Sequence, residues 1–362
     1  MRVLLAGGGT AGHINPAISI ADTIKKNEPD SKFLFVGTKK GMESTLVPKS
    51  GYDIEFIEVS GFKRKLTLEN ALAVLKALGA WGKCCKIIKK FKPDVVIGTG
   101  GYVSGPLLSA ASMMKIPTLI HEQNVFAGLT TRMLSDKVDT VCISFEDSRN
   151  RFEKAKNIVL TGNPVRQELF DLTYEQARAK LGIDEKPLLV SFGGSLGATR
   201  LNESMADYIK TIPDGKYNVL FATGEREYND VLKALKGINK EGVKVVKYIY
   251  NMNEVMQAAD LLVCRAGAIT VSEINALGKP SVLIPSPNVT DNHQFFNAKA
   301  LVDKNAAVMI EEKDLDNKTF CSTVNDLLEN NFKRSEMSAM SKKMGIKNAN
   351  QLIYNEIKKL TS

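Results

Sequence analysis

The sequence predicts an α/β protein of two Rossmann-like domains, each built on a parallel sheet, that face one another across a cleft. The chain has 362 residues, which is more than one hydrophobic core usually holds and therefore favours two domains. A short apolar run, a glycine-rich loop and a helical pattern follow one another four times, twice in each half. Strands that alternate with helices are typical of parallel sheets, which bind ligands at the carboxyl ends of their strands.

The four strand–loop–helix units set the predicted domain boundaries. Their strands begin at Val3, Val95, Leu188 and Leu261. Further strands are predicted at 33–36, 118–120, 140–143, 218–222, 243–246 and 281–284, from short apolar runs between turn signals. The repetition after about residue 165 predicts a first domain at 1–163, a hinge at 162–164 and a second domain at 164–345. A final helix within 346–362 could pack anywhere, including on the first domain.

Composition excludes several classes of protein. The chain is 44% hydrophobic and 25% charged, as soluble globular proteins are. No apolar run reaches the roughly 18 residues that a membrane-spanning helix needs, and we expect no signal peptide at the N-terminus. The five cysteines include no C-x-x-C pair, which fits a reduced, cytosolic protein without a structural zinc.

The net charge of +9 is concentrated in one segment. Residues 63–92 hold nine Lys or Arg and one acid, Glu69, which gives eight of the nine net charges. An apolar row of Val74, Leu78, Trp81, Cys85 and Ile88, bordered by lysines, fits an interfacial helix on anionic lipid. The alternative is an ordinary helix whose apolar face packs on the core. Nucleic acid is not the predicted partner, because no aromatic residues interleave with the basic ones to stack on bases.

The segment at 261–274 predicts a nucleotide-diphosphate site. Its strand runs through the turn at Gly267 into a helix, whose first N–H groups and positive dipole end suit a diphosphate. Glu273, expected in the first helical turn, can accept two hydrogen bonds from a vicinal diol such as a ribose. The alternative is a helix start whose acid is favoured by the dipole alone.

The loop after the first strand predicts an anionic ligand and a general base. Gly7, Gly9 and Gly12 satisfy G-x-G-x-x-G, but the second strand lacks the terminal acid that a bound NAD requires. NAD is therefore rejected. His13 starts the next helix, where the dipole favours a neutral imidazole that can take a proton from an attacking hydroxyl. Capping or packing is the alternative role for His13.

Three further candidates each have an ordinary structural alternative. The loop at 193–198 offers backbone N–H groups and the Ser195 hydroxyl to a phosphate, or serves only strand–helix packing. Arg166 could approach the same anion, or be an ordinary surface arginine. The polar loop at 285–297 could read sugar hydroxyls, or cap a helix at Thr290 or Asp291. Asp314 and Asp316 form a lone D-x-D in a charged context, which predicts a solvated helix start and no metal site.

These motifs together resemble the MurG family of peptidoglycan glycosyltransferases, in the GT-B superfamily. The resemblance covers nearly the whole chain and rests on six ordered motifs, at 8–13, 100–106, 121–124, 162–166, 193–195 and 265–273. It departs from the family pattern at Ala11, where glycine is usual, and at Leu196, where glutamine is common. His293 replaces one of two glutamines found in some members, so only Gln294 is carried over from that pair.

The resemblance implies the site residues. Uracil would lie against Ile249, and the rest of the donor would contact residues of the second domain. The acceptor would meet the first-domain loops, where His13 is the predicted base. The implied substrate-binding set is Thr10, Ala11, Gly12, Asn124, Arg166, Ser195, Ile249, Ala268, Ile269, Thr270, Val271, Ser272, Glu273 and Gln294.

The resemblance also implies the reaction. The family transfers N-acetylglucosamine from UDP-N-acetylglucosamine to the muramyl 4-hydroxyl of lipid I, with inversion, and gives lipid II for peptidoglycan. Closure of the domains at 162–166 would join donor and acceptor. We expect no protein-held metal or cofactor, with stimulation by added magnesium left open, and a peripheral place on the cytoplasmic face of the membrane. A soluble UDP-sugar enzyme such as a 2-epimerase, and a nucleotide-sugar sensor without activity, are the alternatives.

Overall fold

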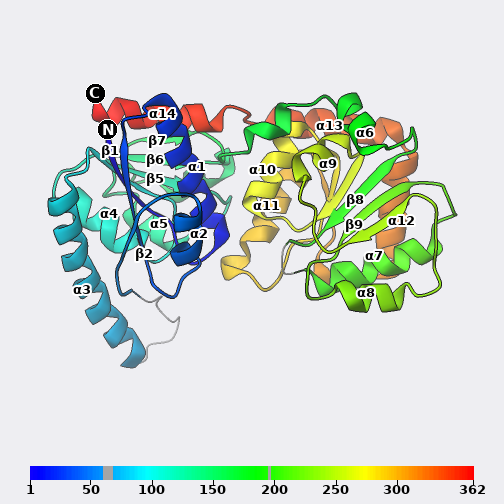
Figure 1. Ribbon diagram of the computed structural model, residues 1–362, viewed down its shortest axis with the longest axis horizontal. Coiled ribbons are helices and arrows are strands. Elements are labelled where there is room, and N and C mark those ends of the chain that lie inside the picture. Colours follow the sequence, from blue (N-terminus) through cyan, green and yellow to red (C-terminus); the bar gives the residue numbers. More distant parts are fainter. Residues whose placement is uncertain (60–67, 195–196) are drawn as a thin grey trace. The chain divides into compact units, whose positions relative to one another are not determined.

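The computed structural model describes residues 1–59, 68–194 and 197–362, and within 68–77 only the path of a helix. The chain forms two compact units, drawn in Figure 1. The N-terminal domain contains Met1–Pro164 and Asn348–Ser362, and the C-terminal domain contains Val165–Lys347. The chain therefore passes between the domains at two places, 164/165 and 347/348, and the first of them adjoins the hinge predicted at 162–164.

The N-terminal domain is a seven-stranded parallel sheet with helices on both faces. Its strand order is β3-β2-β1-β4-β5-β6-β7. Alternate residues of the strands pack on α1, α2 and α14 in one core cluster and on α3, α4 and α5 in the other. The strands are β1 (Arg2–Ala6), β2 (Lys32–Gly37), β3 (Ile54–Phe56), β4 (Val95–Gly98), β5 (Thr118–Glu122), β6 (Thr140–Ile143) and β7 (Ile158–Leu160); the helices are α1 (Ala11–Asn27), α2 (Glu43–Lys49), α3 (Leu68–Phe91), α4 (Ser104–Met113), α5 (Leu129–Leu134) and α14 (Ala349–Thr361).

The C-terminal domain repeats this plan with a six-stranded parallel sheet, in the order β10-β9-β8-β11-β12-β13. One face of the sheet packs on α7, α8, α12 and α13. The strands are β8 (Leu188–Phe192), β9 (Asn218–Ala222), β10 (Val243–Val246), β11 (Leu261–Cys264), β12 (Ser281–Leu283) and β13 (Val308–Met309); the helices are α6 (Tyr174–Leu181), α7 (Thr199–Thr211), α8 (Tyr228–Ala234), α9 (Met252–Ala258), α10 (Ala268–Leu277), α11 (His293–Val302), α12 (Asn317–Glu329) and α13 (Asn331–Met344). The predicted α/β class with two parallel sheets is confirmed.

The four predicted glycine loops lie at the centres of the two sheets. They follow β1 and β4, which are neighbours, and β8 and β11, which are also neighbours. In each sheet the strand order reverses between these two strands. Such a reversal leaves a crevice at the carboxyl ends of the strands, which is where open α/β sheets bind their ligands. The repeated sequence pattern therefore identifies the binding edge of each sheet.

The C-terminal helix completes the N-terminal domain. Ile353 and Ile357 of α14 are fully buried in the same cluster as Val3 and Leu5 of β1. At the helix surface, Tyr354 and Lys358 each donate a hydrogen bond of 2.9 Å to the Glu28 carboxylate. The last residues of the sequence thus cover the sheet formed by the first ones, and in Figure 1 the two termini lie close together.

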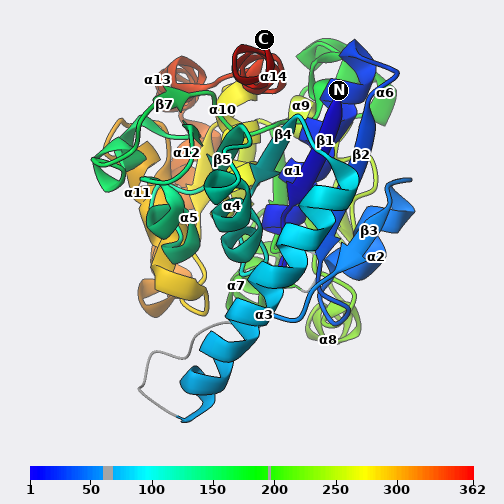
Figure 2. The same cartoon turned by 90° about the vertical axis from the view of Figure 1, so that its left-hand side faces the viewer.

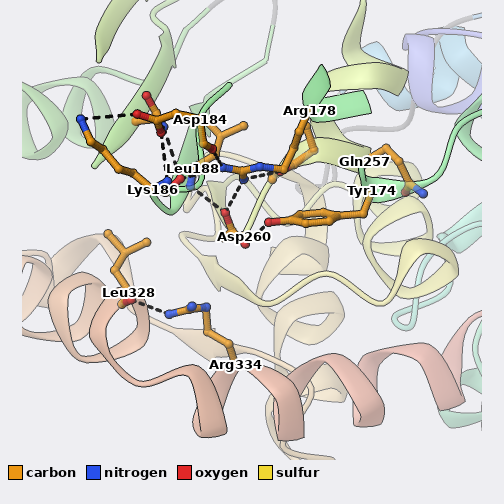
Figure 3. A network of polar contacts seen from close by, with 12 residues as sticks. Tyr174, Arg178, Asp184, Lys186, Leu188, Gln257, Asp260, Leu328 and Arg334 are labelled. Atoms are coloured by element: carbon orange, nitrogen blue, oxygen red, sulfur yellow. Dashed lines mark hydrogen bonds and ion pairs between the residues drawn. The ribbon is translucent and has the colours of Figure 1, made fainter. Parts of the chain in front are cut away.

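A polar cluster stabilises the C-terminal domain at the opposite edge of its sheet from the glycine loops. Asp260 accepts hydrogen bonds from the Leu188 N–H at 2.7 Å, from Arg178 at 2.8 Å and from the Tyr174 hydroxyl at 2.9 Å (Figure 3). Arg178 also donates to the Lys186 carbonyl at 2.7 Å. The cluster joins α6 to the amino ends of β8 and β11, so its role is structural.

Helix α3 faces the core over its C-terminal part. Ile88 is buried in the cluster formed with α4, and Trp81 and Cys85 pack partly buried at the margin of that cluster. Leu78, by contrast, is 62% exposed. The membrane-facing row predicted through Trp81 and Ile88 is therefore wrong for Ile88, because the core covers it. In Figure 2 the N-terminal end of α3 extends past the other helices of its domain. Residues 63–65 of the basic segment lie outside the described residues.

Candidate active site

The N-terminal domain brings three loops together at the carboxyl ends of β1, β4 and β5. Thr10 precedes α1, and Ala11, Gly12 and His13 form its first turn. The β1 and β4 loops touch through their backbones: a Cβ on Gly101, whose φ is +79°, would lie 2.3 Å from the Gly8 carbonyl oxygen. Only glycine allows this approach. The predicted anion loop is therefore fixed by a second glycine loop that precedes α4.

The His13 ring contacts residues of both neighbouring loops. Its Nδ1 lies 3.0 Å from Oε1 of Gln123, which directly follows β5. A Cβ on Gly100 would meet the ring at 2.7 Å, so glycine is required where the ring lies. His13 is half-buried, and its ring lies between the Gln123 amide and the backbone of Gly100.

Asn124 lies beside this group, on the same loop after β5. Its backbone N–H and its side-chain amide donate to Glu122 Oε1 at 3.0 and 3.3 Å. The other Glu122 oxygen accepts from the Gly128 N–H at 3.0 Å. Glu122 is buried and holds the loop that carries Asn124. The structure thus brings Thr10, Gly12, His13 and Asn124 to one edge of one sheet, as the strand pattern predicted.

Glu43 is a functional candidate that the sequence analysis missed. Its buried carboxylate accepts hydrogen bonds from the Gly9 N–H at 3.0 Å, the Thr38 N–H at 2.9 Å and the Thr38 hydroxyl at 2.7 Å. Burial raises the pKa of Glu43, but these hydrogen bonds outweigh burial and leave the pKa below its usual value. Glu43 fixes the β1 loop. No sequence motif indicates this role, because two of its three partners are backbone N–H groups.

In the C-terminal domain, Glu273 and Arg166 form one unit. Arg166 donates to both Glu273 oxygens, from Nε at 2.8 Å and from Nη2 at 3.1 Å. Burial raises the pKa of Glu273 against the opposing effect of Arg166. The expected place of Glu273 in the first turn is wrong: α10 starts at Ala268, and no acid lies in its first turn. Glu273 is the sixth helical residue, so its carboxylate is aligned by Arg166 and not by the helix end.

A cavity of about 180 Å³ adjoins the Arg166–Glu273 pair. Ile249, which is buried, lines it together with Tyr248 and Thr270. Arg166 uses two of its donors on Glu273, while a carboxylate has about four lone-pair positions, so Glu273 retains acceptor capacity. The cavity thus combines an apolar wall with a carboxylate of fixed orientation, which suits a flat base attached to a diol-bearing sugar.

A larger cavity of about 580 Å³ lies at the ends of β8 and β11. Gly193 and Gly194 line it from the β8 loop, and Thr270 and Gln294 line it from α10 and α11. Gln294 is held in place because its Oε1 accepts from the Ser286 N–H at 2.9 Å. Phe192, Gly194 and Thr270 line both cavities, so the two volumes share walls at the start of α10.

The remaining predicted residues divide into three groups. Ala268, Ile269 and Ser272 belong to the first two turns of α10, and none of them lines either cavity. Val271 is fully buried, and its N–H donates to the Gly267 carbonyl, so its side chain is not available to a ligand. Ser195 lies outside the described residues, as does Leu196.

The lone D-x-D belongs to a helix start. Asp316 caps α12 by accepting a hydrogen bond of 2.9 Å from the Thr319 N–H, which is the role its context predicted. Among residues 1–59, 68–194 and 197–362, no group of three or more His, Cys, Asp or Glu side chains has the arrangement of a metal site.

Comparison with known proteins places this site in a family. Residues 3–143 match the model of the glycosyltransferase family 28 N-terminal domain, and residues 188–353 match that of the C-terminal domain. A relative from Caldanaerobacter subterraneus is 50% identical over all of both chains, and one from Acetivibrio thermocellus is 48% identical over 99% of this chain and 98% of its own. Both are named UDP-N-acetylglucosamine–N-acetylmuramyl-(pentapeptide) pyrophosphoryl-undecaprenol N-acetylglucosamine transferase.

Solved structures agree with this assignment. The crystal structure of Acinetobacter baumannii MurG is 30% identical, covers 99% of each chain and superposes with a TM-score of 0.83. A UDP-GlcNAc 2-epimerase from Neisseria meningitidis, 16% identical over 99% of this chain and all of its own, has a TM-score of 0.67 and shares the fold alone. The predicted family is thereby confirmed: the chain belongs to glycosyltransferase family 28 and, within it, to the MurG-type N-acetylglucosaminyltransferases.

Proposed function

We propose that the protein transfers N-acetylglucosamine from UDP-N-acetylglucosamine to the muramyl 4-hydroxyl of lipid I, with inversion, and so makes lipid II. The observation that carries this proposal is the near full-length identity to transferases of that name. The two adjoining cavities at the switch point of the C-terminal sheet support it, because they offer separate volumes for a nucleoside and a sugar.

The donor is assigned to the C-terminal domain. Uracil occupies the smaller cavity against Ile249, and the ribose hydroxyls donate to Glu273. The diphosphate lies at the N-terminus of α10, where the positive end of the helix dipole favours negative charge. Ser195 and Arg166 complete the anion site in this proposal. The N-acetylglucosamine extends into the larger cavity, where the Gln294 amide exchanges hydrogen bonds with the hydroxyls of the sugar.

The acceptor is assigned to the loops after β1, β4 and β5. His13 takes the proton of the muramyl 4-hydroxyl, and the oxygen forms a bond to the anomeric carbon. The bond from that carbon to the diphosphate breaks, and its electron pair leaves with UDP. Attack opposite the leaving group inverts α to β. The α10 N-terminus stabilises the charge that develops on the diphosphate, and the proposal assigns no protein-held metal or cofactor.

A peripheral place on the cytoplasmic face of the membrane follows from the lipid-linked acceptor. No described helix is both long and apolar enough to cross a bilayer. The exposed Leu78 on α3, together with the concentration of lysines and arginines at 63–92, supports attachment to an anionic lipid surface. Nucleic acid is not part of the proposal.

The deciding experiment supplies radiolabelled UDP-N-acetylglucosamine and a lipid I analogue. We expect a lipid-linked disaccharide in which the new linkage is β. UDP-N-acetylmannosamine formed without an acceptor would instead identify a 2-epimerase, and donor binding with neither product would identify a sensor.

In the same assay His13→Ala lowers kcat by about 10²- to 10⁴-fold, while donor affinity stays unchanged because the donor residues lie in the other domain.

A further inference from the structure

A chain of hydrogen bonds runs from a backbone carbonyl to the His13 ring, entirely within the N-terminal domain. His121 Nε2 lies 2.9 Å from the Gly162 carbonyl oxygen. His121 Nδ1 lies 3.0 Å from Nε2 of Gln123, and Oε1 of Gln123 lies 3.0 Å from Nδ1 of His13. His121 and Gln123 are buried, whereas His13 is half-buried. The general base is thus connected to two buried side chains.

The protonation of His121 follows from its partners. A carbonyl oxygen only accepts, so Nε2 of His121 carries the proton that it donates to Gly162. The Ser144 hydroxyl, 3.4 Å from the same nitrogen, donates at 2.7 Å to the Glu122 carbonyl and therefore only accepts from His121. Burial lowers the pKa of His121, which keeps the ring neutral. Nδ1 of His121 consequently holds a lone pair.

The orientation of the Gln123 amide follows from two acceptors. Its Nε2 donates at 3.0 Å to the His121 carbonyl oxygen and at 3.0 Å to the His121 Nδ1 lone pair. Both contacts require the NH₂ group on that side, so the amide oxygen faces His13. An amide oxygen has no proton to give, and Nδ1 of His13 is therefore the donor. The loop itself is tied down, because Asn163 donates at 2.9 Å to the Gln123 carbonyl.

We propose that His121 and Gln123 are positioning residues that hold His13 as the Nδ1–H tautomer, with the Nε2 lone pair directed to the acceptor hydroxyl. The proposal rests on the proposed function only for what that lone pair does. When Nε2 takes the proton of the hydroxyl, Nδ1–H continues to donate to Gln123, and no proton passes along the chain. Gly100 contributes by leaving room for the ring, since any Cβ there would meet Nδ1 at 2.7 Å.

The direct test is the tautomeric state of each histidine in the full-length protein. The chain has only three histidines, so ¹⁵N labelling of histidine gives a simple spectrum, with His13→Gln and His293→Gln used for assignment. We expect His13 to show a protonated Nδ1 and a bare Nε2, and His121 to show the reverse. A His13 ring protonated at Nε2 in its neutral form would overturn the proposal. This readout requires neither substrate nor turnover.

The functional test removes the link with Gln123→Met, which keeps the length of the side chain. We expect the single His13 tautomer to be lost and kcat to fall by about 10- to 100-fold, which is less than the roughly 10²- to 10⁴-fold that a general base itself contributes. The KM for UDP-N-acetylglucosamine stays the same, because the donor residues belong to the other domain. Gln351→Met is the matched control, since Gln351 is an exposed glutamine on α14 of the same domain, and it changes neither quantity.

The two tests separate the positioning of His13 from the proposed function. The expected tautomers in a protein that transfers no sugar would contradict the function and leave the positioning role of His121 and Gln123 in place. Transfer by a protein whose His13 carries its proton on Nε2 would contradict the positioning role and leave the function in place. If Gln123→Met does not fold, the spectrum of the unaltered protein still decides the question. A normal kcat in a folded Gln123→Met protein would remove Gln123 as a positioning residue.

Discussion

At the scale of single residues, the candidate site depends on side chains that position other groups. Arg166 aligns the Glu273 carboxylate through two hydrogen bonds, and Glu43 holds the Gly9 N–H. Neither interaction is local in sequence: Arg166 and Glu273 are 107 residues apart. Each pair holds one polar group of the site in a fixed orientation, so a loss at either site changes geometry as well as charge.

Glu273→Ala should weaken binding of UDP-N-acetylglucosamine by about 10- to 100-fold. The ribose loses a charged hydrogen-bond acceptor, an interaction that contributes about 1.5–3 kcal/mol, and Arg166 loses its partner. Isothermal titration with the donor measures the effect. Glu203→Ala, which removes an exposed glutamate of α7 in the same domain, serves as the control. An unchanged donor affinity for Glu273→Ala would exclude Glu273 as the ribose acceptor.

Glu43→Gln should destabilise the protein at neutral pH and much less in acid. The folded-state pKa of Glu43 lies below its usual value of 4.5, so the ionised carboxylate stabilises the fold above pH 4.5. That contribution is lost as pH falls through the folded-state pKa. Urea unfolding of both proteins between pH 7 and strongly acidic conditions measures the difference in unfolding free energy.

The expected pattern for Glu43 is a difference that shrinks as pH falls below 4.5. Glu55→Gln provides the comparison, since Glu55 is a partly exposed residue of β3 in the same domain. If the unfolding free energies of the unaltered protein and of Glu43→Gln differ by the same amount at every pH, the charge of Glu43 does not contribute to stability.

At the scale of elements, α3 has two parts with different partners. Its C-terminal part is held by the core through Ile87 and Ile88. Nearer the N-terminus of the helix, the apolar side chain of Leu78 is exposed. A helix that is buried along one part of its length and apolar at an exposed part is suited to contact a lipid surface while remaining attached to its domain.

Leu78→Glu should reduce binding to vesicles that contain anionic lipid. The substitution places a negative charge on the exposed part of α3 and removes an apolar contact, so both contributions to lipid binding decrease. Sedimentation with vesicles of mixed zwitterionic and anionic lipid measures the bound fraction. Leu232→Glu, on the exposed surface of α8 in the other domain, is the matched control. Equal vesicle binding by the two variants would contradict a lipid-facing role for α3.

At the scale of the whole molecule, the N-terminal domain is built from two separate segments of the sequence. Residues 348–362 belong to the N-terminal domain although the C-terminal domain precedes them in sequence. Two crossings connect the domains, and Gly162 and Asn163, just before the first, are held by the N-terminal domain through His121 and Gln123. The N-terminal domain therefore needs the end of the chain for its core, whereas the C-terminal domain is contained within one segment.

Ile357→Ala should destabilise the N-terminal domain by about 2–5 kcal/mol, the usual cost of a cavity from such a truncation in a core. Ile357 is fully buried against the β1 side of the sheet. Thermal unfolding, with donor binding followed in parallel, measures the effect. We expect the midpoint temperature of unfolding to fall, while donor affinity at temperatures below the transition is retained. Tyr250→Ala, which alters an exposed side chain of the other domain, should leave the transition in place. Loss of donor binding at low temperature would show that the domains do not respond separately.

Much of the architecture was predictable because strands and glycine loops are local patterns. The strands β6, β9 and β10 begin and end where the apolar runs predicted. The strands β3, β7 and β13 were missed because each has only two or three residues and lies at an edge of its sheet, where half of the backbone lacks a partner and the apolar signal is short. The end of α3 that contains Ile88 was assigned to the wrong surface, because spacing shows an apolar row without showing what covers it.

The sequence by itself determined the fold class, the family, the four loops that form the binding edges and the identity of His13 as a candidate base. Local composition and order are sufficient for these features, because a strand, a glycine turn and a helix start are each encoded within a few residues. Tertiary structure alone decided which groups contact one another. Gln123 is hydrogen-bonded to His13, Arg166 to Glu273 and Glu43 to the Gly9 N–H, and α14 packs on the sheet of the N-terminal domain. Those contacts join residues far apart in the chain, and burial makes them specific because a buried polar group must be satisfied.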